Sequence, residues 1–310
     1  MFSRFLIPAT LALIGLLPTV AQAGKYDLDL TKLGELRGTD AFVTQDNSGF
    51  RSLASELGVV MAPKPTDPAD SLGLAGFAIT TDVSLNTISQ SAGFWDDSAR
   101  GDADRIVPTL QLLGRKGLWP GLEVGAGATK LFDSRMWTVA GYGKAALHEG
   151  FHHLPIPTIA LRGMFSRVLG AKDLFLTTMS VGGSLSHVFG IGSTFHISPY
   201  AGFDALFIIA HSNVLDATPG VDEYDNQQLG VPPTGRDHEF VFRRQDPITR
   251  MRPYGGFRVV FSVLRVGFEA MFALPGSSSD VVPVGNGTTE TAVDNSALQQ
   301  QYSFTVGLDF

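Results

Sequence analysis

The sequence predicts an all-β fold: a membrane-spanning, up-and-down antiparallel barrel of about ten strands, preceded by a short helical segment. Three observations support this fold class. Apolar and polar residues alternate over most of the chain after residue 72, the connections differ in length in a regular way, and the 310 residues include 35 Gly and 22 Phe but no Cys. Alternation with a period of two is typical of strands with one apolar face, and a membrane barrel turns that face toward lipid.

The N-terminus has the pattern of a secretory signal peptide. Arg4 supplies a positive charge, residues 5–17 are almost wholly apolar, and Ala21-Gln22-Ala23 forms an Ala-x-Ala cleavage pattern. This apolar core of about 13 residues is shorter than the roughly 20 that a membrane-spanning helix needs. We therefore expect residues 1–23 to be removed on export.

Residues 24–71 do not alternate and are expected to form a separate N-terminal segment. Ser48 can cap a helix over residues 50–61, which Pro63 would end. Two placements are open for this segment. It could rest on the periplasmic rim, which the Pro-rich tether at 62–70 favours, or it could enter the lumen as a plug.

Ten segments after this region alternate as strands require. In the first, Val83 and Leu85 lie on the face opposite Asp82 and Ser84. The predicted strands cover residues 72–88, 106–113, 121–131, 136–148, 157–169, 174–188, 194–210, 253–264, 266–274 and 298–310. The barrel is therefore expected to occupy residues 72–310.

The last segment alternates most clearly, and the chain ends on its final apolar residue. Its apolar face carries Tyr302, Phe304, Val306, Leu308 and Phe310. This pattern resembles the C-terminal assembly signal of bacterial outer-membrane β-barrel proteins. The resemblance implies a location in the outer membrane of a Gram-negative cell, among its lipid and lipopolysaccharide, and recognition by the barrel assembly machinery.

The connections fall into two groups, as the topology of a bacterial barrel requires. At one end they cover 89–105, 132–135, 170–173, 211–252 and 275–297, and at the other they lie near 114–120, 149–156, 189–193 and 265. Only the first group contains long connections, which matches long extracellular loops and short periplasmic turns. A soluble barrel or sandwich would show no such rule. Residues 239–242 could hide two further strands, so twelve is the alternative count.

The alternation turns a set of charged residues toward the lumen. These are Asp82, Glu123, Lys144, Arg162, Asp204, Arg258 and Glu269. A barrel of about ten strands has a lumen little wider than its side chains, so these charges must pair. They would form either an ion-pair network that closes the pore or the wall of a narrow polar channel.

The longest loop holds a basic cluster at the predicted extracellular rim. Its members are Arg236, Arg243, Arg244, Arg250 and Arg252. Arginine binds phosphate through two parallel hydrogen bonds, so this cluster could face the phosphates of lipopolysaccharide. Pairing with the acidic residues of the same loop is the alternative.

A match to the HExxH zinc motif runs from His148 to His152 and is followed by His153. The zinc chemistry needs a helix, which would place both His side chains on one metal. Here the motif follows a strand, contains Gly150 and is cut off by Pro155. These His residues are therefore only weak metal candidates, and the sequence indicates no cofactor.

Two further patterns leave a membrane-embedded hydrolase as an alternative function. His196 and Ser198 resemble the His-Ser pair of outer-membrane phospholipase A, although here both are expected to face the lumen. The omptin proteases also have ten strands, but Asp237 and His238 are adjacent and do not match the spaced Asp-x-His arrangement of that family.

We therefore expect a non-enzymatic outer-membrane barrel. It would be a narrow channel or transporter for small or hydrophobic compounds, or a structural surface protein. A net charge of −7 argues against a nucleic-acid partner, because phosphate binding needs an excess of Lys and Arg.

Overall fold

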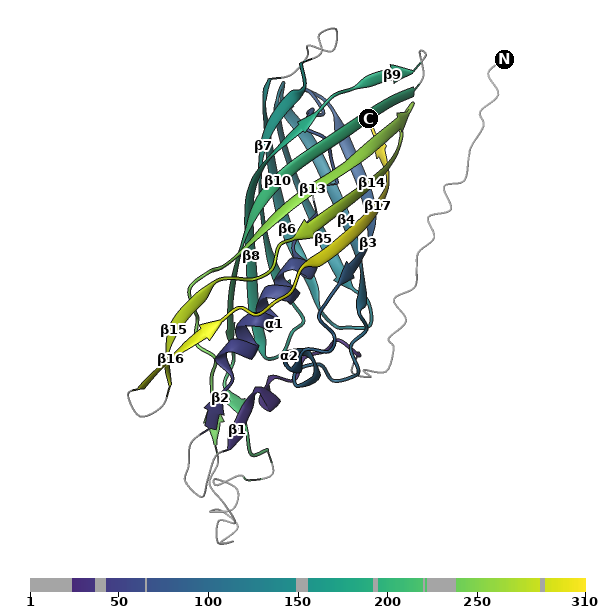
Figure 1. Ribbon diagram of the computed structural model, residues 1–310. Coiled ribbons are helices and arrows are strands. Elements are labelled where there is room, and N and C mark those ends of the chain that lie inside the picture. The colour runs from purple at the N-terminus through teal and green to yellow at the C-terminus, as the bar shows by residue number, and fades with distance from the viewer. Residues whose placement is uncertain are drawn as a thin grey trace, which may run out of the picture.

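The computed structural model describes residues 24–36, 43–64, 66–148, 156–191, 195–219, 221, 238–284 and 288–310. Its main element is a closed barrel of ten antiparallel strands (Figure 1). In order around the barrel these are β3 (Phe77–Thr87), β4 (Ile106–Trp119), β5 (Leu122–Leu131), β6 (Trp137–His148), β7 (Thr158–Leu169), β8 (Leu174–Ser186), β10 (Phe195–Ser212), β13 (Ile248–Phe261), β14 (Leu264–Ala273) and β17 (Gln299–Asp309). β13 pairs with β10 and β17 pairs with β3, so the sheet closes on itself.

The predicted barrel and its strand count of ten are confirmed. The described part of the longest loop forms only a short ribbon outside the barrel, made by β11 (Leu215–Asp216) and β12 (Glu239–Phe240), so the alternative count of twelve is wrong. A further short strand, β9 (Phe189–Ile191), pairs with the start of β10.

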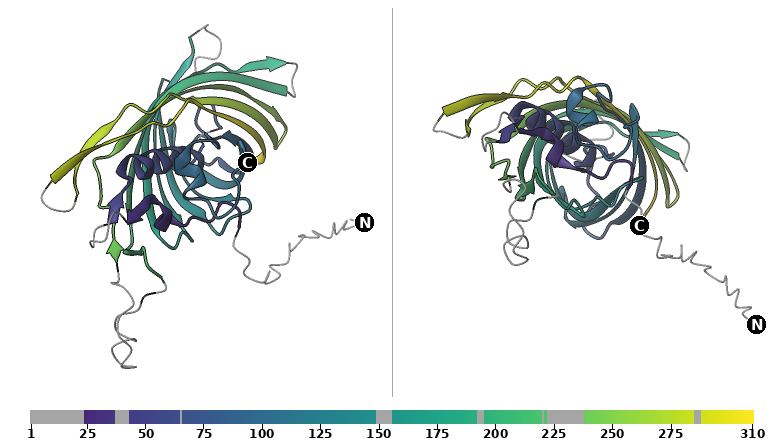
Figure 2. Two further views of the ribbon diagram at one scale, coloured as in Figure 1. Left: turned by 60° about the horizontal axis from the view of Figure 1, so that its bottom comes forward. Right: turned by 90° about the horizontal axis from the view of Figure 1, so that it is seen from below.

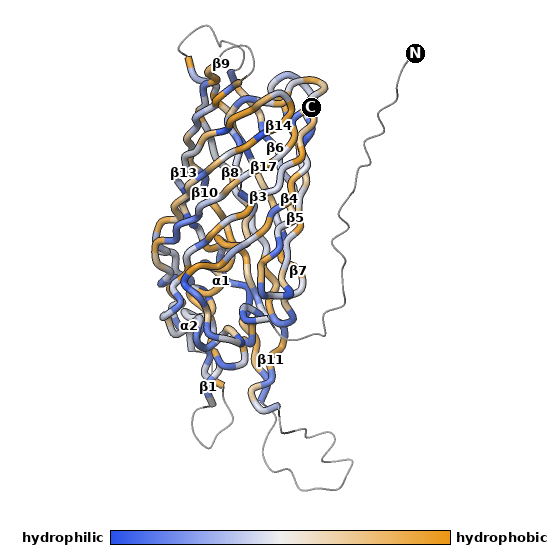
Figure 3. Tube along the Cα trace, turned by 90° about the vertical axis from the view of Figure 1, so that its right-hand side faces the viewer, coloured by the Kyte–Doolittle hydropathy of each residue, from blue (hydrophilic) through white to orange (hydrophobic). Residues whose placement is uncertain are grey.

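The strands turn apolar residues outward and polar residues inward. In β3, Ile79 and Val83 are 42% and 41% exposed, whereas Asp82 and Ser84 are fully buried. Along the Cα trace, apolar and polar residues accordingly alternate (Figure 3). In β17, Phe304, Val306 and Leu308 are exposed on the outer face. An apolar exterior around a polar interior is the arrangement of a transmembrane barrel.

The two ends of the barrel differ. At the end that holds Phe310, β4–β5 and β13–β14 are joined by two-residue turns at 120–121 and 262–263. At the other end lie the connection that carries α2 (Gly93–Asp96) and the one that carries the hairpin of β15 (Ser279–Val284) and β16 (Thr288–Val293). We call these the periplasmic and the extracellular end, as the loop lengths of bacterial barrels require.

The N-terminal segment lies at the extracellular end. It comprises η1 (Leu30–Leu33), β1 (Gly34–Leu36), β2 (Val43–Gln45) and α1 (Asn47–Met61). The predicted helix is present, but its cap is Asp46 instead of Ser48, because the Asp46 side chain accepts a hydrogen bond from the backbone N–H of Gly49 at 2.8 Å. None of the helices among these described residues is long and apolar enough to cross a bilayer.

The C-terminal part of α1 enters the barrel at its extracellular end, and its N-terminal part packs against the β15–β16 hairpin, so the helix does not rest on the periplasmic rim as the Pro-rich tether favoured (Figure 2). Every residue of α1 except Ser48 is buried. Its backbone carbonyls accept hydrogen bonds from opposite walls: Thr138 of β6 donates to Met61 at 3.5 Å and Gln301 of β17 to Val59 at 2.9 Å. Gly58 faces β10 so closely that a Cβ there would lie 2.7 Å from Ile208.

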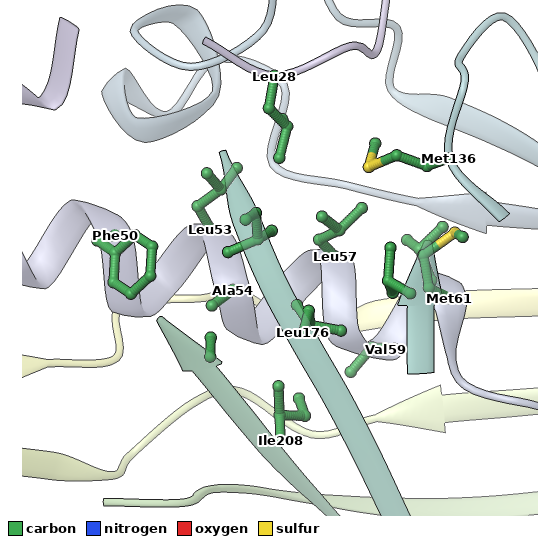
Figure 4. Close-up of a cluster of buried hydrophobic side chains, with 14 of the residues drawn as sticks. Leu28, Phe50, Leu53, Ala54, Leu57, Val59, Met61, Met136, Leu176 and Ile208 are labelled. Atoms are coloured by element: carbon green, nitrogen blue, oxygen red, sulfur yellow. The ribbon is translucent and has the colours of Figure 1, made fainter. Parts of the chain in front are cut away.

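Apolar packing holds α1 in the extracellular half of the lumen (Figure 4). Leu53 and Leu57 of the helix share one buried cluster with Leu176 of β8 and Ile208 of β10. Buried aliphatic side chains contribute about 1.5–3 kcal/mol each, so this cluster fixes the helix firmly.

Candidate functional site

After α1 the described residues 66–72 lie along the lumen and lead toward the periplasmic end. Lys64 donates from its backbone N–H to Gln111 of β4 at 3.0 Å and receives a hydrogen bond from the same amide at 2.9 Å. Farther on, the backbone N–H of Leu72 donates to Glu123 at 3.2 Å, close to the periplasmic turn between β4 and β5. We call residues 66–72 the luminal segment.

The carboxylate of Asp67 in the luminal segment is enclosed by cations from four strands. Arg115 of β4 and Arg265 of β14 lie 2.6 Å from its oxygens, and Arg258 of β13 lies at 3.5 Å. Lys144 of β6 contacts the same carboxylate. We call these four cations the Asp67 cage. The Asp67 side chain is only 1% exposed, so these interactions occur away from bulk water.

The next carboxylate of the luminal segment is also paired. Asp70 contacts Arg258 and accepts a hydrogen bond from the Ser186 hydroxyl at 3.1 Å. The backbone carbonyl of Asp70 accepts from Lys144 at 2.7 Å, and the carbonyl of Thr66 accepts from Arg265 at 2.8 Å. The cage therefore binds both the side chains and the backbone of the luminal segment.

Two further groups of buried polar side chains lie on the wall. Arg252 of β13 binds Asp204 of β10 through two parallel hydrogen bonds of 2.7 and 2.8 Å. Glu269 of β14 accepts a hydrogen bond from the Tyr200 hydroxyl at 3.0 Å. Charges that leave water need such partners, since an unpaired buried charge costs several kcal/mol.

Arginines of the cage also hold N–H groups that make no hydrogen bond within the protein. Among the described residues these buried nitrogens are Nε and Nη2 of Arg115, Nε of Arg258 and Nε of Arg265, and the neighbouring Arg162 has two more, Nε and Nη2. Buried donors in proteins usually have an acceptor. The wall around Asp67 can therefore bind more negatively charged oxygen than the luminal segment supplies.

A cavity of about 650 Å³ opens below the cage at the periplasmic mouth. Its lining includes Asp70 and Leu72 of the luminal segment, His196 and Arg258 of the wall, and the C-terminal Phe310. Arg258 lines this cavity and also contacts Asp67, so the cavity borders one member of the cage.

The seven charged residues predicted to face the lumen are all buried on the inner face. Sequence reasoning missed their main partners. Asp67 and Asp70 lie in the region interpreted as a tether, and Arg115 and Arg265 lie at positions assigned to turns. The inward orientation of the two arginines follows from the alternation of their strands. Arg115 is two residues from the buried Leu113 and Arg265 is four from the buried Glu269, so both lie on the inner face.

The prediction of a basic lipopolysaccharide-facing cluster needs correction. Arg250 and Arg252 are 1% and 0% exposed, because β13 begins at Ile248 and turns both side chains into the barrel. Arg250 binds the hydroxyls of Ser55 and Ser296 there. Arg243 and Arg244 are exposed at the extracellular end, and Arg236 lies outside the described residues.

The sequence motifs for catalysis do not form a site among the described residues. His148 ends β6, whereas His152 and His153 lie outside the described residues, as does Asp237. No hydrogen bond joins His196 to Ser198, both of which the structure describes. The Ser198 hydroxyl accepts instead from Arg258 at 3.4 Å.

Comparisons with known proteins return weak structural likenesses. No family profile matches the chain, and no curated protein matches it. The translocator domain of the autotransporter NalP from Neisseria meningitidis is 9% identical, with a TM-score of 0.37 over 84% of this chain and 96% of that one. The outer-membrane protease OmpT from Escherichia coli is 8% identical, with a TM-score of 0.33 over 76% and 96%.

An outer-membrane channel from Pseudomonas putida F1 is 9% identical, with a TM-score of 0.31 over 80% of this chain and 100% of that one. No role follows from likenesses this weak. The closed ring of ten strands, the apolar exterior and the polar, charge-paired interior identify the chain as a β-barrel of the bacterial outer-membrane type.

Proposed function

We propose that this protein is a gated, non-enzymatic channel for small charged solutes across the outer membrane. The observation that carries the proposal is the luminal segment. One stretch of chain, held mainly by ion pairs and hydrogen bonds, runs through the periplasmic half of the lumen. Water and dissolved ions can replace such contacts, whereas they cannot replace the contacts of an apolar core.

The character of the wall supports small charged solutes over hydrophobic ones. The wall presents Arg115, Lys144, Arg258 and Arg265 to Asp67 of the luminal segment, and an apolar compound in its place would leave these cations without partners. When the luminal segment withdraws, these four cations line the passage and favour anions over cations.

Conductance in planar lipid bilayers tests the proposal. We expect the wild type to be closed most of the time. The double variant Asp67→Asn/Asp70→Asn should be open more often and should prefer anions, because the luminal segment no longer neutralises the wall. Asp96→Asn/Asp97→Asn is the matched control, since it removes two carboxylates that are exposed at the extracellular end. It should conduct like the wild type.

The competing role is that of a structural surface protein with a permanently filled lumen. If the luminal double variant retains its β-sheet circular dichroism, inserts into the bilayer and still carries no current above baseline, the channel proposal is wrong and the structural role is supported.

A further inference from the structure

We propose that the Asp67 cage is a binding site for a small oxyanion with two negative charges, such as inorganic phosphate or sulfate, and that Asp67 occupies this site as a built-in substitute. The inference rests on the proposed function in one respect, namely that the luminal segment can withdraw from the cage.

The geometry around Asp67 is that of an anion site. Arginine and lysine nitrogens from β4, β6, β13 and β14 converge on one carboxylate from different sides, two of them at 2.6 Å. Arginine is suited to oxyanions because its planar guanidinium presents several N–H donors at fixed angles. A carboxylate offers two oxygens to these donors, whereas a tetrahedral oxyanion offers four.

The unused N–H groups of the cage are an independent observation that points to the same ligand. Arg115, Arg258 and Arg265 each carry at least one buried guanidinium nitrogen without an acceptor, although each also binds a carboxylate. Their side chains are at least nine-tenths buried. An oxyanion with more oxygens than Asp67 would supply acceptors for these donors, which cost free energy when they are buried and unpaired.

Charge balance favours two negative charges on the ligand. The four cage cations face three carboxylates, those of Asp67, Asp70 and Glu123. Arg162 and Asp309 lie at the margin of the cluster and add one charge of each sign. Asp82, fully buried on the wall and bound to Thr66, adds a fifth carboxylate, so the charges balance while the luminal segment is in place. Two positive charges remain when Asp67 and Asp70 withdraw together, and a divalent anion neutralises both.

The cage borders the cavity at the periplasmic mouth. The cavity of about 650 Å³ at that mouth is lined by Arg258 and Asp70, which form an ion pair with each other. A phosphate ion that enters the cavity therefore meets Arg258 first, and it can then displace Asp70 and Asp67 in turn.

Calorimetric titration with inorganic phosphate tests binding directly. The Asp67→Asn protein should bind phosphate at least about tenfold more tightly than the wild type, because the competing carboxylate is gone. Adding Arg265→Gln to Asp67→Asn should abolish this gain, and Asp97→Asn alone should behave as the wild type. Equal affinity in the wild type and Asp67→Asn, or a gain that survives Arg265→Gln, would overturn the proposal.

A second measurement does not depend on removing a charge from the cage. The chain has no Cys, so Ala69→Cys places a single thiol in the luminal segment, at a position that is fully buried. An uncharged maleimide labels this thiol only while the luminal segment is withdrawn. Phosphate at about ten times its Kd for the withdrawn state should raise the population of that state, and hence the rate of labelling, about tenfold. Chloride at equal ionic strength should not. An equal effect of both salts would contradict a specific site.

The conductance and binding experiments can fail separately. Current through the luminal double variant without phosphate binding would reject the oxyanion site and keep the channel. Phosphate binding without current would reject the channel and keep the oxyanion site.

Discussion

The two halves of the lumen are filled in different ways. In the extracellular half, α1 packs Leu53 and Leu57 into an apolar cluster with the strands around it. In the periplasmic half, the luminal segment is held by ion pairs, chiefly those of Asp67 and Asp70. A dissolved anion can replace the carboxylate of an ion pair, whereas it cannot replace apolar packing. We therefore expect α1 to stay bound permanently and the luminal segment to be displaced by anions. The following substitutions test this difference.

The largest effect is expected from Asp67→Ala. This change leaves four buried cations without their shared carboxylate, which should lower the free energy of unfolding by about 3–5 kcal/mol. Added phosphate should restore part of that loss, since it can occupy the cage. Urea titration of the protein in detergent micelles, with and without phosphate, gives both values. If phosphate leaves the urea unfolding of Asp67→Ala unchanged, anions do not replace the Asp67 carboxylate in the periplasmic half.

A somewhat smaller effect is expected from Leu57→Ala in the other half. The side chain is fully buried in the apolar cluster, so its truncation should cost about 2–5 kcal/mol. Phosphate should restore none of this loss, because no anion fills an apolar cavity. The same urea titration allows a direct comparison with Asp67→Ala. If phosphate raised the free energy of unfolding of both variants equally, the two halves would not differ in how they are held.

Gly58→Ala should have an intermediate effect through crowding. The added Cβ would lie 2.7 Å from Ile208 of β10, so helix or strand must shift at a cost of about 1–3 kcal/mol. Ile208→Ala in the same protein should relieve the collision. A loss in the double variant smaller than the sum of the two single losses would support direct packing of α1 on the wall, and a purely additive loss would argue against it.

The smallest effect on stability is expected from Arg243→Glu/Arg244→Glu. Both residues are exposed at the extracellular end, so the free energy of unfolding should change by less than about 0.5 kcal/mol. Co-purification of lipopolysaccharide, measured by phosphate content, should nevertheless fall if these two arginines bind it. If the amount of co-purified lipopolysaccharide is unchanged, these two arginines do not bind it.

The sequence predicted the barrel well because alternation with a period of two is visible in any strand that separates lipid from a polar interior. The same parity placed Asp82, Lys144 and Glu269 on the inner face. Alternation does not identify the strand residues that extend beyond the lipid-facing part of the barrel. At Arg250 and Arg252 only one of the two outward neighbours, Met251, is apolar and the other is Thr249, so the alternation there is weak and the sequence predicts a loop.

The content of the lumen could not be predicted in the same way. The luminal segment has no periodicity, and its role depends on contacts with strands more than 40 residues away, such as that of Asp67 with Arg115. The helix α1 is buried on nearly all sides, yet its sequence contains Arg51 and Glu56. Both are paired with loop groups, Arg51 with Ser278 and Glu56 with Trp95, and such partners are not visible in a sequence.

The position of α1 restricts the order in which the barrel can be built. The chain passes from the extracellular end through the lumen and then continues directly into β3, which pairs with β17 to complete the ring. If the ring closed first, the helix and the residues before it would have to be threaded through a finished pore, a route that protein chains avoid. If β17 instead joins β3 last, the strands wrap around the helix and no threading is needed. The junction between the first and last strands is then the final step of biogenesis, and it closes the barrel around a helix that is already in place.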